Sequence, residues 1–245
     1  MATTSSIKTE SDWQPDQREM GPFGLNGRDL DTPRSRSHGK ASIIDHPVAQ
    51  HVLSSLRNRN TSSRQFRALS QQLLALIAFE ATRTLPTREV SIKTEVSSCA
   101  GRTLAKQVVF LSLTRHGIGL AHNLADFIPN TSIGTVSLDH VYEGHKVEPR
   151  LHLAHAPALN DVRVILFDPV VNTGLSAAIA LNFLGRLGAT ELSLITFLIT
   201  RPGIDRVQSN TRNLSIWTAA IDPELDPKKG PLPGLGNFAE RLYGC

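Results

Sequence analysis

The chain has 245 residues, of which 40% are hydrophobic, and a formal net charge of +4 at pH 7. Its length suits one large domain with a core, while two widely separated cysteines and the lack of any run of ~20 apolar residues argue against a disulfide scaffold, a secreted protein and a membrane-inserted one. We therefore expect a cytoplasmic protein. A Lys/Arg stripe with interleaved aromatics, typical of nucleic-acid binders, is missing, so the mild positive charge fits a basic cleft for a small polyanion or a surface without function.

The first 44 residues differ in composition from the rest. They are rich in Ser, Thr, Asp, Arg, Gly and Pro, carry as many acidic as basic side chains, and have no sustained apolar period. Such a segment cannot bury enough apolar surface to offset the entropy cost of ordering. We predict a disordered N-terminal tail over residues 1–44, dispensable for folding, and one folded domain over residues 45–245.

Two amphipathic helices are predicted at the start of this domain. Apolar residues recur at helical spacing over 52–56 and again over 66–78. The apolar faces around Leu53, Leu73 and Ile77 exceed what one face of a sheet must cover. We therefore predict self-association into a homodimer or a larger homo-oligomer.

Five segments predict strands. One alternates as a half-exposed strand does and four are apolar runs typical of buried strands; in chain order they are 90–96, 108–113, 133–138, 162–167 and 192–199. Helical segments alternate with them, which favours an α/β fold with a doubly wound, mostly parallel sheet of about five strands. Residues 139–160 are too long and too polar for a simple connection, so we expect a flap or hairpin there.

A polar loop joins the apolar run 162–167 to an Ala/Leu-rich helix. Backbone N–H groups at a helix N-terminus, with the hydroxyls of Thr173 and Ser176, suit an anion. Asp168 at the carboxyl end of the strand suits ribose hydroxyls or a magnesium ion. An ordinary strand-to-helix connection, capped by Asn172 and Thr173, is equally compatible with the spacing. The glycine patterns of dinucleotide-binding loops and P-loops are absent.

Two further loops carry candidate residues. Arg115 follows the apolar run 108–113, where its guanidinium could bind diphosphate oxygens or simply be a solvated charge; its neighbour His116 could add a donor. Near the C-terminus, residues 228–238 contain two prolines and three glycines. With this composition they can form neither a helix nor a central strand, so we predict a loop of fixed conformation. This loop is either a rigid arm on the core or part of a binding site.

Residues 168–176 also resemble a known motif. Their sequence, Asp-Pro-Val-Val-Asn-Thr-Gly-Leu-Ser, is similar to the phosphoribosyl-diphosphate motif Asp-Pro-Met-Leu-Ala-Thr-Gly-Gly-Ser of the uracil phosphoribosyltransferases. Further segments follow in family order: His46–His51, Phe79–Arg83, Arg115–Gly117, Trp217–Asp222 and Pro233–Gly236. From about Asp45 to the C-terminus the chain thus resembles a divergent member of this family.

The resemblance implies a type I phosphoribosyltransferase fold and an enzyme of pyrimidine salvage. Such an enzyme makes UMP and diphosphate from uracil and phosphoribosyl diphosphate (PRPP), with Mg²⁺ arriving on PRPP, no protein metal ligands and no single catalytic acid or base. Its partners would be these small molecules, not nucleic acid or a membrane. The implied PRPP-binding residues are Arg115, His140, Asp168, Pro169, Val170, Val171, Asn172, Thr173, Gly174, Leu175, Ser176 and Asn237. The implied uracil-binding residues are Pro231, Gly236, Asn237 and Phe238.

Four positions depart from the family pattern. His140 stands in place of an arginine of the flap, and Asn237 in place of an acid. Leu175 replaces a glycine and would be strained if that position needs a positive φ, while Pro231 has no N–H to offer a base. These departures leave a second hypothesis, a catalytically impaired phosphoribosyltransferase-like binding or regulatory protein, and a third, a phosphoribosyltransferase for another base.

Overall fold

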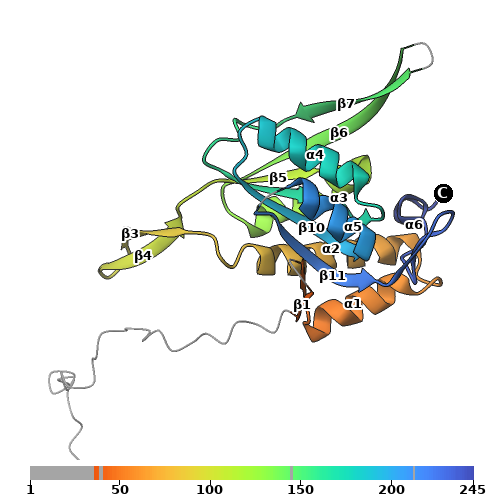
Figure 1. Ribbon diagram of the computed structural model, residues 1–245. Helices are drawn as coiled ribbons and strands as arrows, with labels where there is room; N and C mark the ends of the chain where they lie inside the picture. Colours follow the sequence, from red (N-terminus) through yellow and green to blue (C-terminus); the bar gives the residue numbers. More distant parts are fainter. Residues whose placement is uncertain (1–35, 39–40, 144–145, 212) are drawn as a thin grey trace, which may run out of the picture. The chain divides into compact units, whose positions relative to one another are not determined.

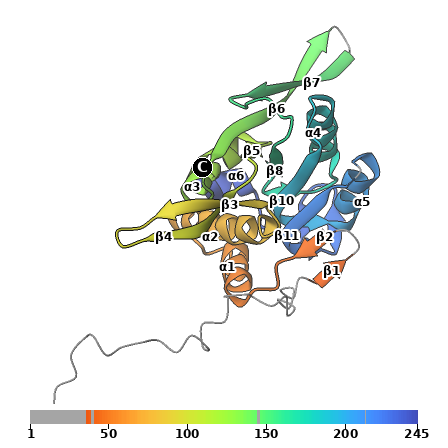
Figure 2. The same ribbon diagram turned by 90° about the vertical axis from the view of Figure 1, so that its left-hand side faces the viewer.

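The computed structural model describes the backbone of residues 36–38, 41–143, 146–211 and 213–245. Side chains are described in these ranges except at residues 36–38, 125, 139–143 and 146–150. None of the helices in the described ranges has the length and apolar character of a bilayer span. The described residues form a central sheet with helices on both faces and two smaller hairpins (Figures 1 and 2).

The central sheet is mostly parallel, which confirms the predicted doubly wound α/β fold. Its neighbouring strands, in spatial order, are β1 (Arg36–His38), β2 (Ala41–Ile43), β11 (Ser215–Asp222), β10 (Glu191–Thr200), β8 (Arg163–Phe167), β5 (Val108–Ser112), β6 (Thr131–Glu143) and β7 (Lys146–Ala154). The short strand β9 (Val170–Val171) also pairs with β10. Only the two edge pairs, β1 with β2 and β6 with β7, are antiparallel.

Helices bury both faces of the sheet, which explains why its central strands are continuous apolar runs. The helices are α1 (Pro47–Arg57), α2 (Ser63–Ala81), α3 (Arg115–Phe127), α4 (Leu175–Arg186), α5 (Arg201–Asn210) and α6 (Phe238–Tyr243). Strand β8 shows the division: Ile165 and Phe167 belong to the apolar cluster of α1, α2, α3 and α6, whereas Val164 and Leu166 belong to that of α4 and α5.

The apolar faces of the first two helices are covered within the chain. Leu53 is 4% exposed, and Leu73 and Ile77 are fully buried in the first cluster. The prediction that these residues form a self-association surface is therefore wrong. The sheet face they cover is larger than the sequence indicated, because β11 and α6 add Ala219, Phe238 and other apolar side chains to it.

One strand prediction differs from the structure, and one strand inside the central sheet was not predicted. The alternating segment 90–96 is not a strand of the central sheet; β3 (Thr87–Lys93) pairs with β4 (Ser98–Leu104) in a separate hairpin that projects from the body (Figure 2). Conversely, β11 was not predicted as a strand. The 139–160 segment does contribute to a hairpin: β6 and β7 pair antiparallel from Thr135 opposite Ala154 to Glu143 opposite Lys146.

The predicted tail extends too far into the chain. Residues 1–35 and 39–40 lie outside the described residues, but β2 pairs in parallel with β11, and β1 pairs with β2. Ala41 is fully buried, Ile44 is 3% exposed, and the Ile44 N–H donates to the Thr218 carbonyl over 2.8 Å. The folded domain therefore includes these residues, although so short an apolar stretch has no period that the sequence could reveal.

This correction predicts different effects for two truncations. A chain that starts at residue 45 loses β1, β2 and the buried side chains of Ala41 and Ile44, at a cost of roughly 2–3 kcal/mol. Its thermal midpoint should fall by roughly 5–10 °C, as differential scanning calorimetry would measure. A chain that starts at residue 36 is the control and should keep its midpoint. Equal midpoints for the two chains would contradict the structural role of β2.

Candidate active site

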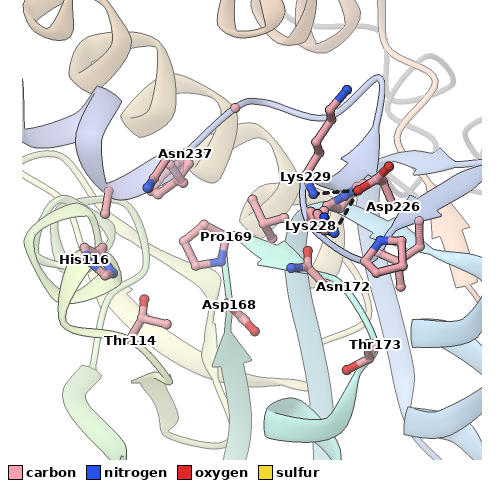
Figure 3. A pocket seen from close by; sticks show the side chains of 18 residues that line it. Thr114, His116, Asp168, Pro169, Asn172, Thr173, Asp226, Lys228, Lys229 and Asn237 are labelled. Atoms are coloured by element: carbon pink, nitrogen blue, oxygen red, sulfur yellow. Dashed lines mark hydrogen bonds between the residues drawn. The ribbon is translucent and has the colours of Figure 1, made fainter.

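A pocket of about 540 Å³ lies at the carboxyl ends of β5 and β8 (Figure 3). Three segments line it: the start of α3, the loop after β8, and the stretch between β11 and α6. The lining residues are Thr114, His116, Asp168, Pro169, Val170, Asn172, Thr173, Leu225, Asp226, Pro227, Lys228, Lys229, Gly230, Pro231, Gly236, Asn237, Phe238 and Ala239. The structure thus brings together the polar loop and the C-terminal loop, which lie over 50 residues apart in sequence.

The loop after β8 is held by the start of α5. Gly174 has a φ of +73°, and a Cβ there would lie 2.6 Å from the carbonyl oxygen of Gly203, so this turn requires glycine. The Thr200 hydroxyl donates to the Asn172 carbonyl over 2.5 Å and accepts the Gly203 N–H over 3.1 Å. The loop is therefore preformed at the N-terminus of α4, whose first amides lack intrahelical acceptors and favour an anion.

Leu175 is not strained. It is the first residue of α4, and the positive φ falls one position earlier, on Gly174. The expectation of strain at Leu175 is therefore not met. Its side chain is 53% exposed and does not line the pocket.

The predicted PRPP residues divide into two groups. Those that line the pocket are Asp168, Pro169, Val170, Asn172, Thr173 and Asn237. Those that do not are Arg115, Val171, Gly174, Leu175 and Ser176. The backbone of His140 lies in β6, opposite Pro149, but its side chain lies outside the described ones. All four predicted uracil residues, Pro231, Gly236, Asn237 and Phe238, line the pocket.

Asp168 is a half-buried carboxyl group in the middle of the lining (Figure 3). Burial raises the pKa of Asp168 to about 7, while a hydrogen bond from the Val170 backbone acts in the opposite direction. Its own N–H donates to the Ile195 carbonyl over 3.1 Å, which fixes the backbone at the strand end. Near neutral pH this group can therefore either accept a hydrogen bond as a carboxylate or donate one as an acid.

A buried ion pair holds the C-terminal loop. Arg57 donates to both oxygens of Asp222, at 2.6 Å and 3.2 Å, and the Asp222 side chain is 2% exposed. The Gly234 N–H donates to Asp222 over 2.8 Å, and Arg57 donates to the Gly234 carbonyl over 2.9 Å. One Arg–carboxylate pair therefore fixes the turn that carries residues 228–238, which serve both as an arm on the core and as pocket wall.

Phe238 and Asn237 have structural tasks beside their place in the pocket. The Phe238 ring packs edge-on to Phe66, with 5.3 Å between centroids, and lies 5.8 Å from Phe197. The Asn237 side chain accepts the Glu240 N–H over 3.3 Å and so caps α6. At these two positions the loop can therefore offer a ligand only backbone groups and the amide N–H₂ of Asn237.

Four charged or titratable lining residues are absent from the predicted PRPP and uracil residues: His116, which the sequence indicated only as a possible further donor, and Asp226, Lys228 and Lys229. His116 lines the pocket in place of Arg115, because Thr114 caps α3 and the second helical residue, not the first, faces the cavity. Lys228 and Lys229 complete the group; their backbone N–H groups both donate to Asp226 over 2.8 Å. The sequence pattern that could have indicated these two residues is a pair of adjacent lysines directly after Asp226-Pro227, a dipeptide typical of turns.

The described residues contain no cluster of three or more His, Cys, Asp or Glu side chains that could hold a metal ion by themselves. Asp168 and Asp226 are the carboxylates that line the pocket, and Asp226 is engaged by the turn. A magnesium ion typically keeps water and substrate phosphate ligands and needs only one or two carboxylates. The residues present therefore fit an ion that enters on a phosphate ligand.

Comparison with known proteins gives consistent matches. A family model described as uracil phosphoribosyltransferase matches residues 43–245. Proteins named uracil phosphoribosyltransferase from Bacillus velezensis and Alkaliphilus oremlandii are 32% and 33% identical to this chain; each match covers 84% of this chain, and 99% and 98% of the respective relative. The solved AQ2163 protein from Aquifex aeolicus superposes with a TM-score of 0.74 at 22% identity, over 83% of this chain and 97% of that one, and supports the fold.

Proposed function

The chain belongs to the uracil phosphoribosyltransferase family, and from this premise we propose that it transfers the 5-phosphoribosyl group of PRPP to N1 of uracil. The products are UMP and diphosphate, which makes it a pentosyltransferase of pyrimidine salvage. One observation carries the proposal: the polar loop after β8 and the C-terminal loop, the two segments needed for PRPP and for the base, line one pocket.

Catalysis of this reaction depends mainly on positioning the two substrates and on stabilising the charge that develops during the transfer. Asn172 and Thr173, which line the pocket just before the N-terminus of α4, bind the 5-phosphate. Asp168 accepts hydrogen bonds from the ribose hydroxyls, and in its ionised form it stabilises the positive charge that develops at the sugar carbon. The C-terminal loop orients uracil through the backbone of Gly236 and Phe238, since Pro231 has no N–H to donate.

We propose Mg²⁺ as the cofactor, with Asp168 as the protein group that would hold it. When bound, the ion supplies positive charge that stabilises the departing diphosphate. The pKa of about 7 at Asp168 means that binding of a cation there is coupled to release of a proton near neutral pH.

A regulatory or binding role without turnover is the second candidate. It is favoured by Asn237, whose carboxamide lacks the charge of the family's acid and is used to cap α6. Such a protein would bind PRPP or UMP in the same pocket without releasing diphosphate.

Conversion of radiolabelled uracil to UMP, with PRPP and magnesium, tests the proposal. Cytosine, hypoxanthine and adenine run in parallel distinguish an enzyme for another base. We expect UMP to form from uracil, and no nucleotide to form from the other three bases. Binding of PRPP without any product from any base would replace the proposal with the regulatory role.

We further propose that the protein is a homodimer or larger and works in the cytoplasm. The surface we assign to self-association is the β3–β4 hairpin with the neighbouring helices, where Ile92, Val96, Phe79 and Phe127 are between 43% and 96% exposed. Isolated two-stranded hairpins are marginally stable in water, which favours cover by a partner. Free Cys99 and Cys245 fit a reducing compartment.

Sedimentation velocity at micromolar concentration should therefore give a species of at least twice the 26.7 kDa chain mass. Phe79→Ser with Val96→Ser should shift it toward monomer, because both side chains are strongly exposed and their loss costs the monomer little. Val48→Ser, an exposed apolar position on α1, is the control. A monomeric wild type would contradict the proposal.

A further inference from the structure

Two lysines stand at the tip of a small hairpin beside the pocket. Strands β12 (Glu224–Asp226) and β13 (Gly230–Leu232) pair antiparallel, with Asp226 opposite Gly230. The intervening residues include Lys228 and Lys229, whose backbone N–H groups donate to Asp226 Oδ1. The backbone of the tip is therefore fixed by the hairpin and by Asp226, while both lysine side chains extend from it.

The hairpin tip lies against the polar loop after β8. A Cβ built on Gly230 would lie 3.7 Å from the Asn172 Nδ2. Figure 3 shows Lys228, Lys229 and Asp226 on the same side of the pocket as Asn172, with His116 and Asn237 on the opposite side. The hairpin tip therefore borders the part of the pocket next to Asn172, and the flexible Lys229 side chain in Figure 3 is extended away from Asn172.

The lysines are also the permanent cations of the described pocket lining. The other basic lining residue is His116, and Arg115 does not line the pocket. Neither lysine forms an ion pair with a described carboxylate at 4.0 Å or less. Among the lining carboxylates, Asp226 is already engaged by two N–H groups. This side of the pocket thus combines free ammonium groups with a helix N-terminus, an arrangement that attracts a phosphate dianion.

We propose that Lys228 and Lys229 bind the 5-phosphate of the ligand, from the side of the pocket where the hairpin tip lies next to the polar loop after β8. The inference rests on the proposed function, because the 5-phosphate is the group that PRPP and UMP share. Lysine suits this task as a point charge on a flexible stem, which can follow the phosphate without demanding one fixed geometry. Affinity for uridine, which lacks the phosphate, should not depend on these residues.

Calorimetric titration of the full chain with UMP, uridine and PRPP tests this assignment. The double substitution Lys228→Gln with Lys229→Gln keeps the backbone N–H groups that anchor the turn and removes both charges. It should weaken UMP and PRPP binding by ~100-fold, as expected for loss of two charged contacts, and leave uridine binding unchanged. The salt dependence of UMP affinity should become shallower. Lys228→Arg with Lys229→Arg should retain most of the affinity.

Lys93→Gln, an exposed lysine of β3 outside the pocket, is the matched control and should behave as wild type. Unchanged UMP affinity in the double glutamine variant would overturn the inference while leaving the proposed function in place. An equal loss of uridine and UMP affinity would also overturn it, since the lysines would then shape the pocket without contacting phosphate. Failure of the wild type to bind either UMP or PRPP would instead overturn the proposed function.

Discussion

Asp168→Asn is expected to abolish most of the activity and yet make the protein more stable at alkaline pH. The pKa of Asp168 rises from about 3.9 in an unfolded chain to about 7 in the fold. The stability tied to this protonation is therefore fully present below about pH 4 and lost as the pH rises through 7. Asparagine is neutral at every pH, so the variant does not lose this stability as the pH rises.

The size of the gain follows from the same pKa values. A rise from about 3.9 to about 7 corresponds to at most ~4 kcal/mol, and we expect about 2 kcal/mol because the half-buried carboxyl keeps contact with the open pocket. At pH 8 the midpoint of Asp168→Asn should exceed that of wild type by roughly 5 °C, and the two should converge near pH 4.

The activity of Asp168→Asn should fall in parallel, by on the order of 100-fold or more in kcat/KM, because asparagine supplies no negative charge to the developing cation. Calorimetry from pH 4 to 8 and the uracil assay give the two readouts. Asp205→Asn, an exposed site on α5, is the control and should change neither. A variant that is less stable than wild type at pH 8 would show the opposite, that Asp168 stabilises the fold as an anion.

Arg57→Met should be the most destabilising single substitution proposed here. It leaves the carboxylate of Asp222, 2% exposed, without its partner, and breaking a buried pair in this way costs about 3–5 kcal/mol. The thermal midpoint should fall by roughly 10 °C. The turn at Gly234 also loses a hydrogen bond, so the KM for uracil should rise more than the KM for PRPP.

Two further variants separate stability from positioning. Arg64→Met removes an exposed arginine of α2 and should leave both KM values unchanged. Arg57→Met with Asp222→Leu replaces the pair by apolar groups and should regain part of the lost stability, because no buried charge is left unpaired. Its KM for uracil should stay high, since Gly234 then lacks both of its partners, Arg57 and Asp222. Recovery of the KM together with stability would show that the pair has no role in placing the base loop.

The elements that the sequence predicted best are the strands whose two faces are buried. Strands β5, β8 and β10 were evident because helices cover both faces and select uninterrupted apolar runs. The sequence predicted less well which strand pairs with which. Alternation over 90–96 indicates a half-exposed strand but not its partner, and the parallel pairing of Ala41–Ile43 with β11 leaves no local pattern at all.

The same division applies to the site. The segments were predictable because each motif is continuous in sequence, but the side chains that face the pocket depend on where a helix begins. The cap at Thr114 turns His116 rather than Arg115 toward the cavity, and the helix start at Leu175 puts the positive φ on Gly174. The lysines at 228 and 229 join the site through the β12–β13 hairpin, which tertiary pairing creates.

Amide hydrogen exchange with and without UMP tests whether one pocket, formed by two loops that are distant in sequence, binds both the phosphoribosyl group and the base. We expect slower exchange on UMP binding in two segments, residues 170–176 and residues 228–238, with little change in the β3–β4 hairpin. Protection confined to one of the two segments, or to the hairpin, would show that the two loops do not bind the nucleotide together.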